Sequence, residues 1–193
     1  MTNRAQAKKQ TRQRLLRAAK QEFVAQGMLK ISTVDIARGA GVAHGTLFFH
    51  FQTKENLVEK VLDNELLKIS AELGALLHGS SGVEGLLNTY LDFLEREEEF
   101  FVVLARETPL YPPTLRRIIL GRECAIRQYF YQALQSAIEQ GQCKEVDITT
   151  VLNFLFGTLN YYLSLRDSFA GGQSVINAKR RTIVSTFIQL LSK

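Results

Sequence analysis

Apolar residues recur at three- and four-residue intervals along almost the whole chain, which is the spacing of amphipathic helices. No segment keeps the strict alternation of a half-buried strand. The sequence therefore predicts an all-α protein of about nine helices. The predicted helices cover residues 7–26, 32–39, 42–51, 53–78, 83–97, 99–107, 113–140, 147–168 and 174–192.

Residues that begin or end helices punctuate the first third of the chain. Gly27 ends the first helix, and Thr53 caps the long helix that follows the two short ones. Ser32 and Asp35 form a predicted capping box, in which the serine oxygen accepts from the Asp35 N–H and the carboxylate reaches back. Gly41 supplies the positive φ that a tight turn between two short helices requires. This is the spacing of a helix-turn-helix.

The charge distribution fits a nucleic-acid partner for this segment. The chain carries a formal net charge of +5, but residues 1–60 hold eleven basic and four acidic residues, so that the remainder carries −2. A basic first third on a slightly acidic body is typical of a module that binds an anionic surface. Residues 43–50 are then free to enter a major groove, which admits one α-helix. We expect a DNA-binding domain over residues 1–52 and a second domain over 53–193.

A set of residues in the first third carries a family resemblance. They are Thr11 to Leu16, Ala18, Ala19, Phe23, Gly27, Asp35 to Ala37, Ala40 to Val42, Gly45 to Phe48, Phe51 and Lys54 to Leu57. With these residues, the chain resembles the TetR (tetracycline-repressor-like) family of transcriptional regulators over about residues 8–60. The resemblance implies an N-terminal three-helix helix-turn-helix domain followed by a helical-bundle domain for ligand binding and dimerisation. It implies a repressor that binds an operator in double-stranded DNA as a homodimer and responds to a small-molecule effector.

Roles in DNA binding follow from this resemblance. His44 and Thr46 would read base edges, Phe49 would pack on a thymine methyl, and His50 and Lys54 would bind phosphates. Two departures stand out: Ala43 offers no side-chain cap, and Phe48 has no hydroxyl for a phosphate. The basic residues from Arg4 to Arg12 could follow the DNA as a disordered arm. The expected DNA-binding residues are Thr33, Ala43, His44, Gly45, Thr46, Phe49, His50 and Lys54.

The second domain is expected to pair subunits and enclose an effector. The predicted dimer helices span 147–168 and 174–192, and Gly157 would permit close approach between them. Their proposed interface stripes comprise Val151, Leu155, Leu159, Tyr162 and Leu163 on one helix, with Ile183, Phe187 and Leu190 or Leu191 on the other. The expected ligand-binding residues are Phe93, Phe101, Tyr129, Phe154 and Tyr161. The acidic run 97–99 is expected to be solvated.

Other classes of protein find little support in the sequence. There is no nucleophile elbow, phosphate-binding loop or metalloprotease motif, so neither an enzyme nor a cofactor is expected. The two cysteines and three histidines do not form a metal site. No apolar run approaches the length of a membrane span, and we expect a cytoplasmic protein. A helical small-molecule or lipid carrier and a DNA-binding protein without an effector remain as alternatives.

Overall fold

The computed structural model describes residues 3–79 and 82–193, and this part of the chain forms ten α-helices and one short 3₁₀ turn. The all-α prediction is confirmed. The helices are α1 (Asn3–Gln26), α2 (Thr33–Gly39), α3 (His44–Phe51), α4 (Lys54–His78), α5 (Gly82–Arg96), α6 (Glu98–Glu107), α7 (Pro113–Glu139), α8 (Ile148–Ser164), α9 (Arg166–Ala170) and α10 (Val175–Leu191), with the 3₁₀ turn η1 at Thr108–Leu110.

Two predicted helix boundaries are wrong. The helix expected over 147–168 is divided at Leu165 into α8 and the short α9, which raises the number of helices to ten. The basic N-terminal segment is not a disordered arm, since α1 already begins at Asn3. Its regular spacing of alanine, glutamine and basic residues favours helix, and these residue types have good helix propensity.

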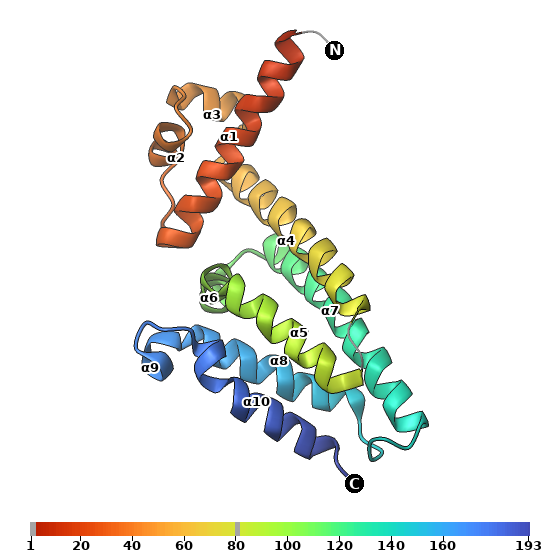
Figure 1. Ribbon diagram of the computed structural model, residues 1–193. Helices are drawn as coiled ribbons and strands as arrows, with labels where there is room; N and C mark the ends of the chain where they lie inside the picture. The colour runs from red at the N-terminus through yellow and green to blue at the C-terminus, as the bar shows by residue number, and fades with distance from the viewer. Residues whose placement is uncertain (1–2, 80–81) are drawn as a thin grey trace.

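The helices are arranged as a small head on a longer body (Figure 1). The head consists of α1, α2 and α3, and α4 leads from it into the body, where it runs beside α7. Helices α5, α6, α8, α9 and α10 complete the body. The buried apolar residues of head and body form one continuous cluster. Within it, the rings of Phe23 of α1 and Phe100 of α6 pack edge-on, with their centres 5.2 Å apart. The head is therefore packed on the body as well as tethered to it.

Most of the predicted helix ends are found, with one correction. The Ser32 hydroxyl accepts from the Asp35 N–H, but the Asp35 carboxylate pairs with Arg38 at 3.0 Å instead of reaching back. The second half of the capping box is therefore absent. Thr53 caps α4 through the Asn56 N–H at 3.0 Å, and Gly41 has the predicted positive φ, +64°.

The acidic run at 97–99 is not simply solvated. Glu98 is buried, and its carboxylate accepts hydrogen bonds from the Ser174 hydroxyl and from the N–H groups of Val175 and Ile176. These are the free donors at the start of α10, where a negative charge is also favoured by the helix dipole. Glu98 thus holds the last helix against the body.

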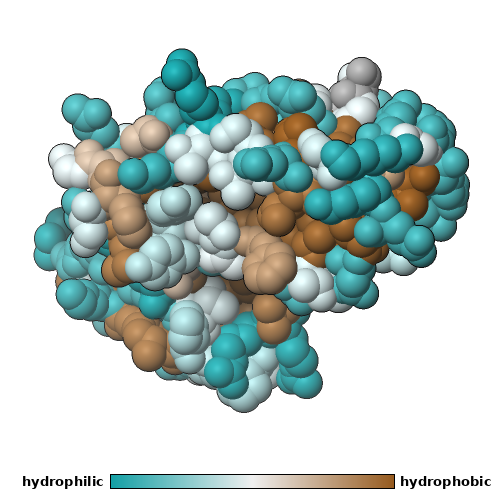
Figure 2. Space-filling view, turned by 90° about the horizontal axis from the view of Figure 1, so that it is seen from below, coloured by the Kyte–Doolittle hydropathy of each residue, from teal (hydrophilic) through white to brown (hydrophobic). Residues whose placement is uncertain are grey.

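The surface of the body combines polar and apolar areas. Figure 2, seen from the end opposite the head, shows brown apolar side chains reaching the surface in several places among teal polar ones. Within residues 3–79 and 82–193, no helix is both long and apolar enough to cross a membrane.

Candidate functional site

The outer side of α3 is the most unusual surface of the head. Leu47 and Phe51 are the buried residues of this helix and attach it to the rest of the head. Phe49, in contrast, is 69% exposed, and Phe48 is 38% exposed. Two neighbouring aromatic side chains in water contribute little to the stability of the head, so they point to a surface that binds something.

Thr33 of α2 and His44 of α3 meet at the start of the predicted recognition helix, α3. The Thr33 hydroxyl lies 3.0 Å from Nε2 of His44, and the ring of Phe48 stands edge-on to the His44 ring at 5.0 Å. The imidazole is held from two sides, which fixes its direction before any ligand arrives. Two of the predicted DNA-binding residues are therefore coupled to each other.

The basic first turns of α1 lie across the aromatic cluster of α3. Nζ of Lys8 lies 5.0 Å from the centre of the Phe49 ring, and the Arg12 guanidinium lies 5.2 Å from the Phe51 ring. Partial burial, together with these two cations, lowers the pKa of His50 below its ordinary value. Positive charge is thus brought to the surface that α3 exposes, and a phosphate would find several partners there.

The remaining predicted DNA-binding residues frame the same surface. Ala43 precedes α3 and makes no side-chain cap, and Gly45 is exposed beside it. Thr46 is half-buried, one turn into the helix. Lys54 begins α4, and its ammonium donates to the carbonyl of Leu29 at 3.4 Å. Its side chain thereby ties the start of α4 to the loop after α1, a contact that the sequence did not predict.

The turn between α3 and α4 has a backbone conformation that the sequence did not predict. Gln52 has a φ of +63°, the left-handed region that favours glycine, and it is the one residue other than glycine with a positive φ among the described residues. Its N–H donates to the Phe48 carbonyl at 2.8 Å. The positive φ of Gln52 ends α3 and turns the chain toward α4, which begins two residues later.

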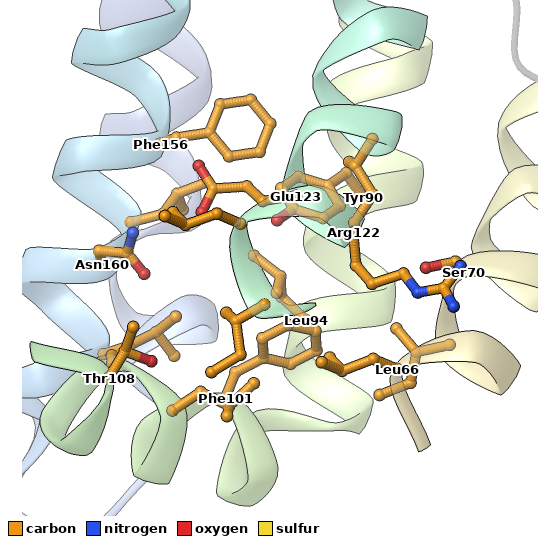
Figure 3. Close-up of a pocket in the computed structure, with 18 of the residues that line it drawn as sticks. Leu66, Ser70, Tyr90, Leu94, Phe101, Thr108, Arg122, Glu123, Phe156 and Asn160 are labelled. Atoms are coloured by element: carbon orange, nitrogen blue, oxygen red, sulfur yellow. The ribbon is translucent and has the colours of Figure 1, made fainter. Parts of the chain in front are cut away.

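The body contains a cavity of about 270 Å³ between α4, α5, α6, α7 and α8 (Figure 3). Its walls are mostly apolar, and its polar residues are few. The residues that line it are Leu66, Ile69, Ser70, Tyr90, Leu94, Phe101, Leu104, Ala105, Thr108, Pro109, Ile119, Leu120, Arg122, Glu123, Ile126, Phe156, Leu159, Asn160 and Leu163. Such a cavity has the character of a small-molecule site.

The structure does not gather the five predicted ligand-binding residues in this cavity. Phe101 lines it, but Phe93 is buried elsewhere in the core. Tyr129 stacks edge-on against His78 at 5.3 Å, away from the cavity. Phe154 and Tyr161 lie on the outer side of α8 and are 60% and 55% exposed. Side chains from five helices make the cavity, and a sequence pattern gives no information on which of them converge.

The stripes predicted for a dimer interface are also placed differently. Val151, Leu155, Leu159 and Leu163 are buried within the chain, as are Ile183, Phe187 and Leu191, so these stripes form its own core. The free apolar side chains of the two helices are Phe154, Tyr161 and Leu190. Phe154 and Leu190 border a groove between α8 and α10, and Gly157 has open space around it. We call Phe154, Tyr161 and Leu190 the outer apolar face.

Two carboxylates join the head to the cavity wall. Glu107 accepts from the N–H groups of Met28 and Leu29, at 2.8 and 3.3 Å, and from the Tyr111 hydroxyl at 2.7 Å. Burial and this hydrogen bond raise the pKa of Tyr111, so its hydroxyl remains a donor. The next two residues, Thr108 and Pro109, line the cavity.

The second carboxylate is that of Glu65 on α4, which pairs with Lys20 of α1 at 2.9 Å. Burial alone would raise the pKa of Glu65, but hydrogen bonds from Lys68 and Lys20 outweigh it and hold that pKa below its usual value. Leu66, the next residue, lines the cavity. Both carboxylate links between head and body therefore lie next to residues of the cavity wall.

The comparisons with known proteins agree with this geometry. The family described as "Bacterial regulatory proteins, tetR family" matches residues 15–61, which include all of α2 and α3. Over 153 residues, the chain is 26% identical to the HTH-type transcriptional regulator SrpR of Pseudomonas putida, covering 78% of this chain and 72% of SrpR. It is also 26% identical over 164 residues to the HTH-type transcriptional repressor KstR2 of Mycobacterium tuberculosis, covering 82% of this chain and 81% of KstR2.

The fold is shared with solved regulators as well. The transcriptional regulator FadR from Bacillus subtilis, solved in complex with stearoyl-CoA, superposes with a TM-score of 0.75 at 17% identity. The match covers 91% of this chain and 97% of FadR. The similarity therefore extends from the head through the body and includes the part of the chain that encloses the cavity.

Proposed function

Because the chain belongs to the TetR family of transcriptional regulators, we propose that it is a dimeric repressor that releases a palindromic operator when a small molecule fills its cavity. Membership makes it a DNA-binding regulator and not an enzyme. We assign residues 1–52 to DNA binding and residues 53–193 to effector binding and dimerisation. Its place of action would be the cytoplasm, where the operator is.

The exposed outer side of α3 is the observation that supports the proposed binding of DNA. With Leu47 and Phe51 holding the helix, His44, Gly45 and Phe49 are free to reach base edges in a major groove. Lys8 and Arg12 of α1 lie on the same side as His50, where they would meet phosphates. Thr33 and Lys54 would bind the backbone at the two ends of the helix-turn-helix.

A second copy of this chain is the occupant that we propose for the outer apolar face. A single eight-residue helix reads few base pairs, and two-fold symmetry would double the site and place two α3 helices one turn of DNA apart, ~34–36 Å. The exposure of Phe154, Tyr161 and Leu190 supports this proposal, since apolar patches of this kind favour association. The dimer helices would remain those predicted, with different side chains at the interface.

Release of DNA would follow from the links between cavity and head. A ligand can shift a conformational equilibrium only by its difference in affinity for the two states. If the ligand-filled cavity moves Thr108 or Leu66, then Glu107 and Glu65 move with them, and α1 follows through Met28 and Lys20. The two recognition helices of a dimer would then no longer match the spacing of the two half-sites.

Mobility-shift assays with DNA fragments from upstream of its own gene test the proposal. We expect one fragment to be retained at moderate salt while unrelated DNA is not, with an affinity that falls steeply as salt rises. Hydroxyl-radical footprinting of that fragment should then reveal two protected half-sites on one face of the duplex. Uniform binding to all fragments would contradict a specific operator, and a single protected half-site would contradict the dimer.

A further inference from the structure

The proposed effector cavity indicates what kind of molecule would fill it, and this inference rests on the proposed function. We propose that the cavity takes a compact, uncharged, mostly apolar molecule that carries a ring and a hydroxyl, carbonyl or neutral aromatic amine group, and that it does not hold an acyl-CoA. Four properties of its lining lead to this chemical class: size, aromatic walls, balanced charge and one unsatisfied hydroxyl.

The size of the cavity limits the ligand. Its volume of about 270 Å³ equals the share of roughly nine water molecules in liquid water. Sites for drug-sized ligands have volumes of about 300 to 1,000 Å³. A ring system with a short substituent fills such a space, whereas a long acyl chain together with its nucleotide does not.

The walls of the cavity favour a ring. Phe156 and Tyr90 lie together on one side, with ring centres 5.6 Å apart (Figure 3). The Arg127 guanidinium stacks on Phe156 at 4.4 Å and holds that ring in place from outside the cavity. Phe101 faces them from α6. Fixed aromatic faces suit an aromatic or flat alicyclic ligand, because such rings stack offset or edge-on.

The charges of the lining are balanced. Glu123 pairs with Nε of Arg127 at 2.8 Å, and Arg122 pairs with Asp63 at 3.3 Å. Neither charged residue of the lining is left without an opposite charge. A ligand that brought a phosphate, sulfonate or ammonium group into this cavity would lose its hydration without gaining a free counter-ion. The lining therefore selects against both anions and cations.

One polar atom of the lining has no partner. Oγ of Ser70 is buried and has no hydrogen-bond partner among the residues that the structure describes. Ser70 and Asn160 lie on opposite sides of the cavity in Figure 3, with the Tyr90 hydroxyl between them. Burial raises the pKa of Tyr90, so that this hydroxyl stays protonated. If the Ser70 side chain turns toward the cavity, a ligand with one polar atom on its rim would satisfy Oγ of Ser70 and leave its apolar surface to the walls.

Three fluorescent probes that share a naphthylamine core test the inference. N-phenyl-naphthylamine is neutral, anilinonaphthalene sulfonate adds a negative charge to the same skeleton, and naphthyl ethylenediamine carries a positive charge. We expect the full-length protein to bind the neutral probe at least about tenfold more tightly than either charged probe, and stearoyl-CoA not to displace it. Equal or tighter binding of a charged probe, or displacement by stearoyl-CoA, would overturn the inference.

Two substitutions show whether the probe occupies this cavity. Ser70→Ala should weaken binding of the neutral probe about threefold to tenfold, the factor typical of one hydrogen bond. Its control, Ser136→Ala, removes an exposed hydroxyl of α7 and should change nothing. Ala105→Phe should fill the cavity and abolish binding. If Ala105→Phe is folded by circular dichroism and still binds the probe, or if it is unfolded and Ser70→Ala binds as tightly as wild type, the inference is wrong.

Retention of the operator fragment in the mobility-shift assay tests the proposed function independently of probe binding. A protein that binds the fragment and releases it with a charged molecule would disprove the chemical class and leave the regulator intact. A protein that binds the neutral probe in this cavity but retains no fragment would support the chemical class and contradict the proposed repressor.

Discussion

His44 and Lys54 differ in what surrounds them, and this difference predicts different roles in DNA recognition. His44 opens the recognition helix, where Thr33 and Phe48 fix its ring. Lys54 begins α4 and lies against the loop after α1. A ring held rigidly at a groove suits reading of base edges, whereas an ammonium at the edge of the groove suits a phosphate.

We expect His44→Ala to change the order of preference among operator variants. Lys54→Ala should weaken all sequences alike and lower the slope of log affinity against log salt by about one. Binding measured on a panel of single-base operator variants at several salt concentrations separates the two effects. If both variants weaken all sequences equally, His44 does not read bases.

We expect His50 to make DNA binding depend on pH. Partial burial, Lys8 and Arg12 lower its pKa in the free protein, so that the ring is mostly neutral at pH 7. A neighbouring phosphate would favour the charged form, so that binding takes up a proton. Operator affinity should therefore rise as the pH falls from about 7.5 to 6.

The variant His50→Gln keeps a polar side chain but does not titrate. It should show a flatter pH profile than the wild-type protein, measured by fluorescence anisotropy at constant ionic strength. Identical profiles for the two proteins would place His50 away from the phosphates.

Glu107 and Gly27 join two helices that are far apart in the sequence. Gly27 has a φ of +83°, and a Cβ built there would lie 2.0 Å from Oε1 of Glu107. The carboxylate cannot move away freely, because it accepts hydrogen bonds from Met28, Leu29 and Tyr111. The end of α1 and the end of α6 are therefore fitted to each other at a single side chain.

This fit predicts a non-additive pair of substitutions. Gly27→Ala should reduce the free energy of unfolding by about 2–4 kcal/mol in the wild-type protein, through the strained φ and the displaced carboxylate. In a Glu107→Ala background the clash is gone, and only about 1–2 kcal/mol should remain. Urea unfolding of the wild-type protein, the two single variants and the double variant gives the coupling free energy between the two positions. Additive effects would show that the carboxylate does not press on Gly27.

We propose that two chains assemble through the outer apolar face, which belongs to α8 and α10 together. Phe154 and Tyr161 stand on one side of α8, and Leu190 contributes from α10. A dimer that buries this face needs about 800 Å² of surface from each subunit. A charge placed in its centre would be buried without a partner, which association cannot tolerate.

We therefore expect Phe154→Asp to be monomeric in sedimentation equilibrium at micromolar concentration. Its operator affinity should fall at least about tenfold, because the two half-sites are then bound independently. Leu67→Asp places the same charge at an exposed leucine of α4 and should remain dimeric. If the Phe154→Asp variant is still dimeric, the interface does not lie on the outer apolar face.

The sequence by itself determined the helices, the capped helix-turn-helix and the concentration of positive charge in the first third. These features depend on neighbours a few positions apart, such as Thr53 with Asn56, and a local pattern records them. The seven-residue α2 and the positive φ of Gly41 were predictable for this reason. The departure at Ala43 was predictable too, since α3 does begin without a side-chain cap.

The tertiary structure alone decided which side of each body helix faces which space. The apolar arc of α8 is wide and holds Phe156 and Phe154 near its two edges, so its pattern does not distinguish Phe156, which lines the cavity, from Phe154, which faces outward. Glu98 and Glu107 look like surface acids in the sequence, yet they accept N–H groups more than seventy residues away. Such partners meet only when the chain is folded, because contacts between distant segments depend on how the helices pack. No periodic pattern in the sequence predicts these contacts.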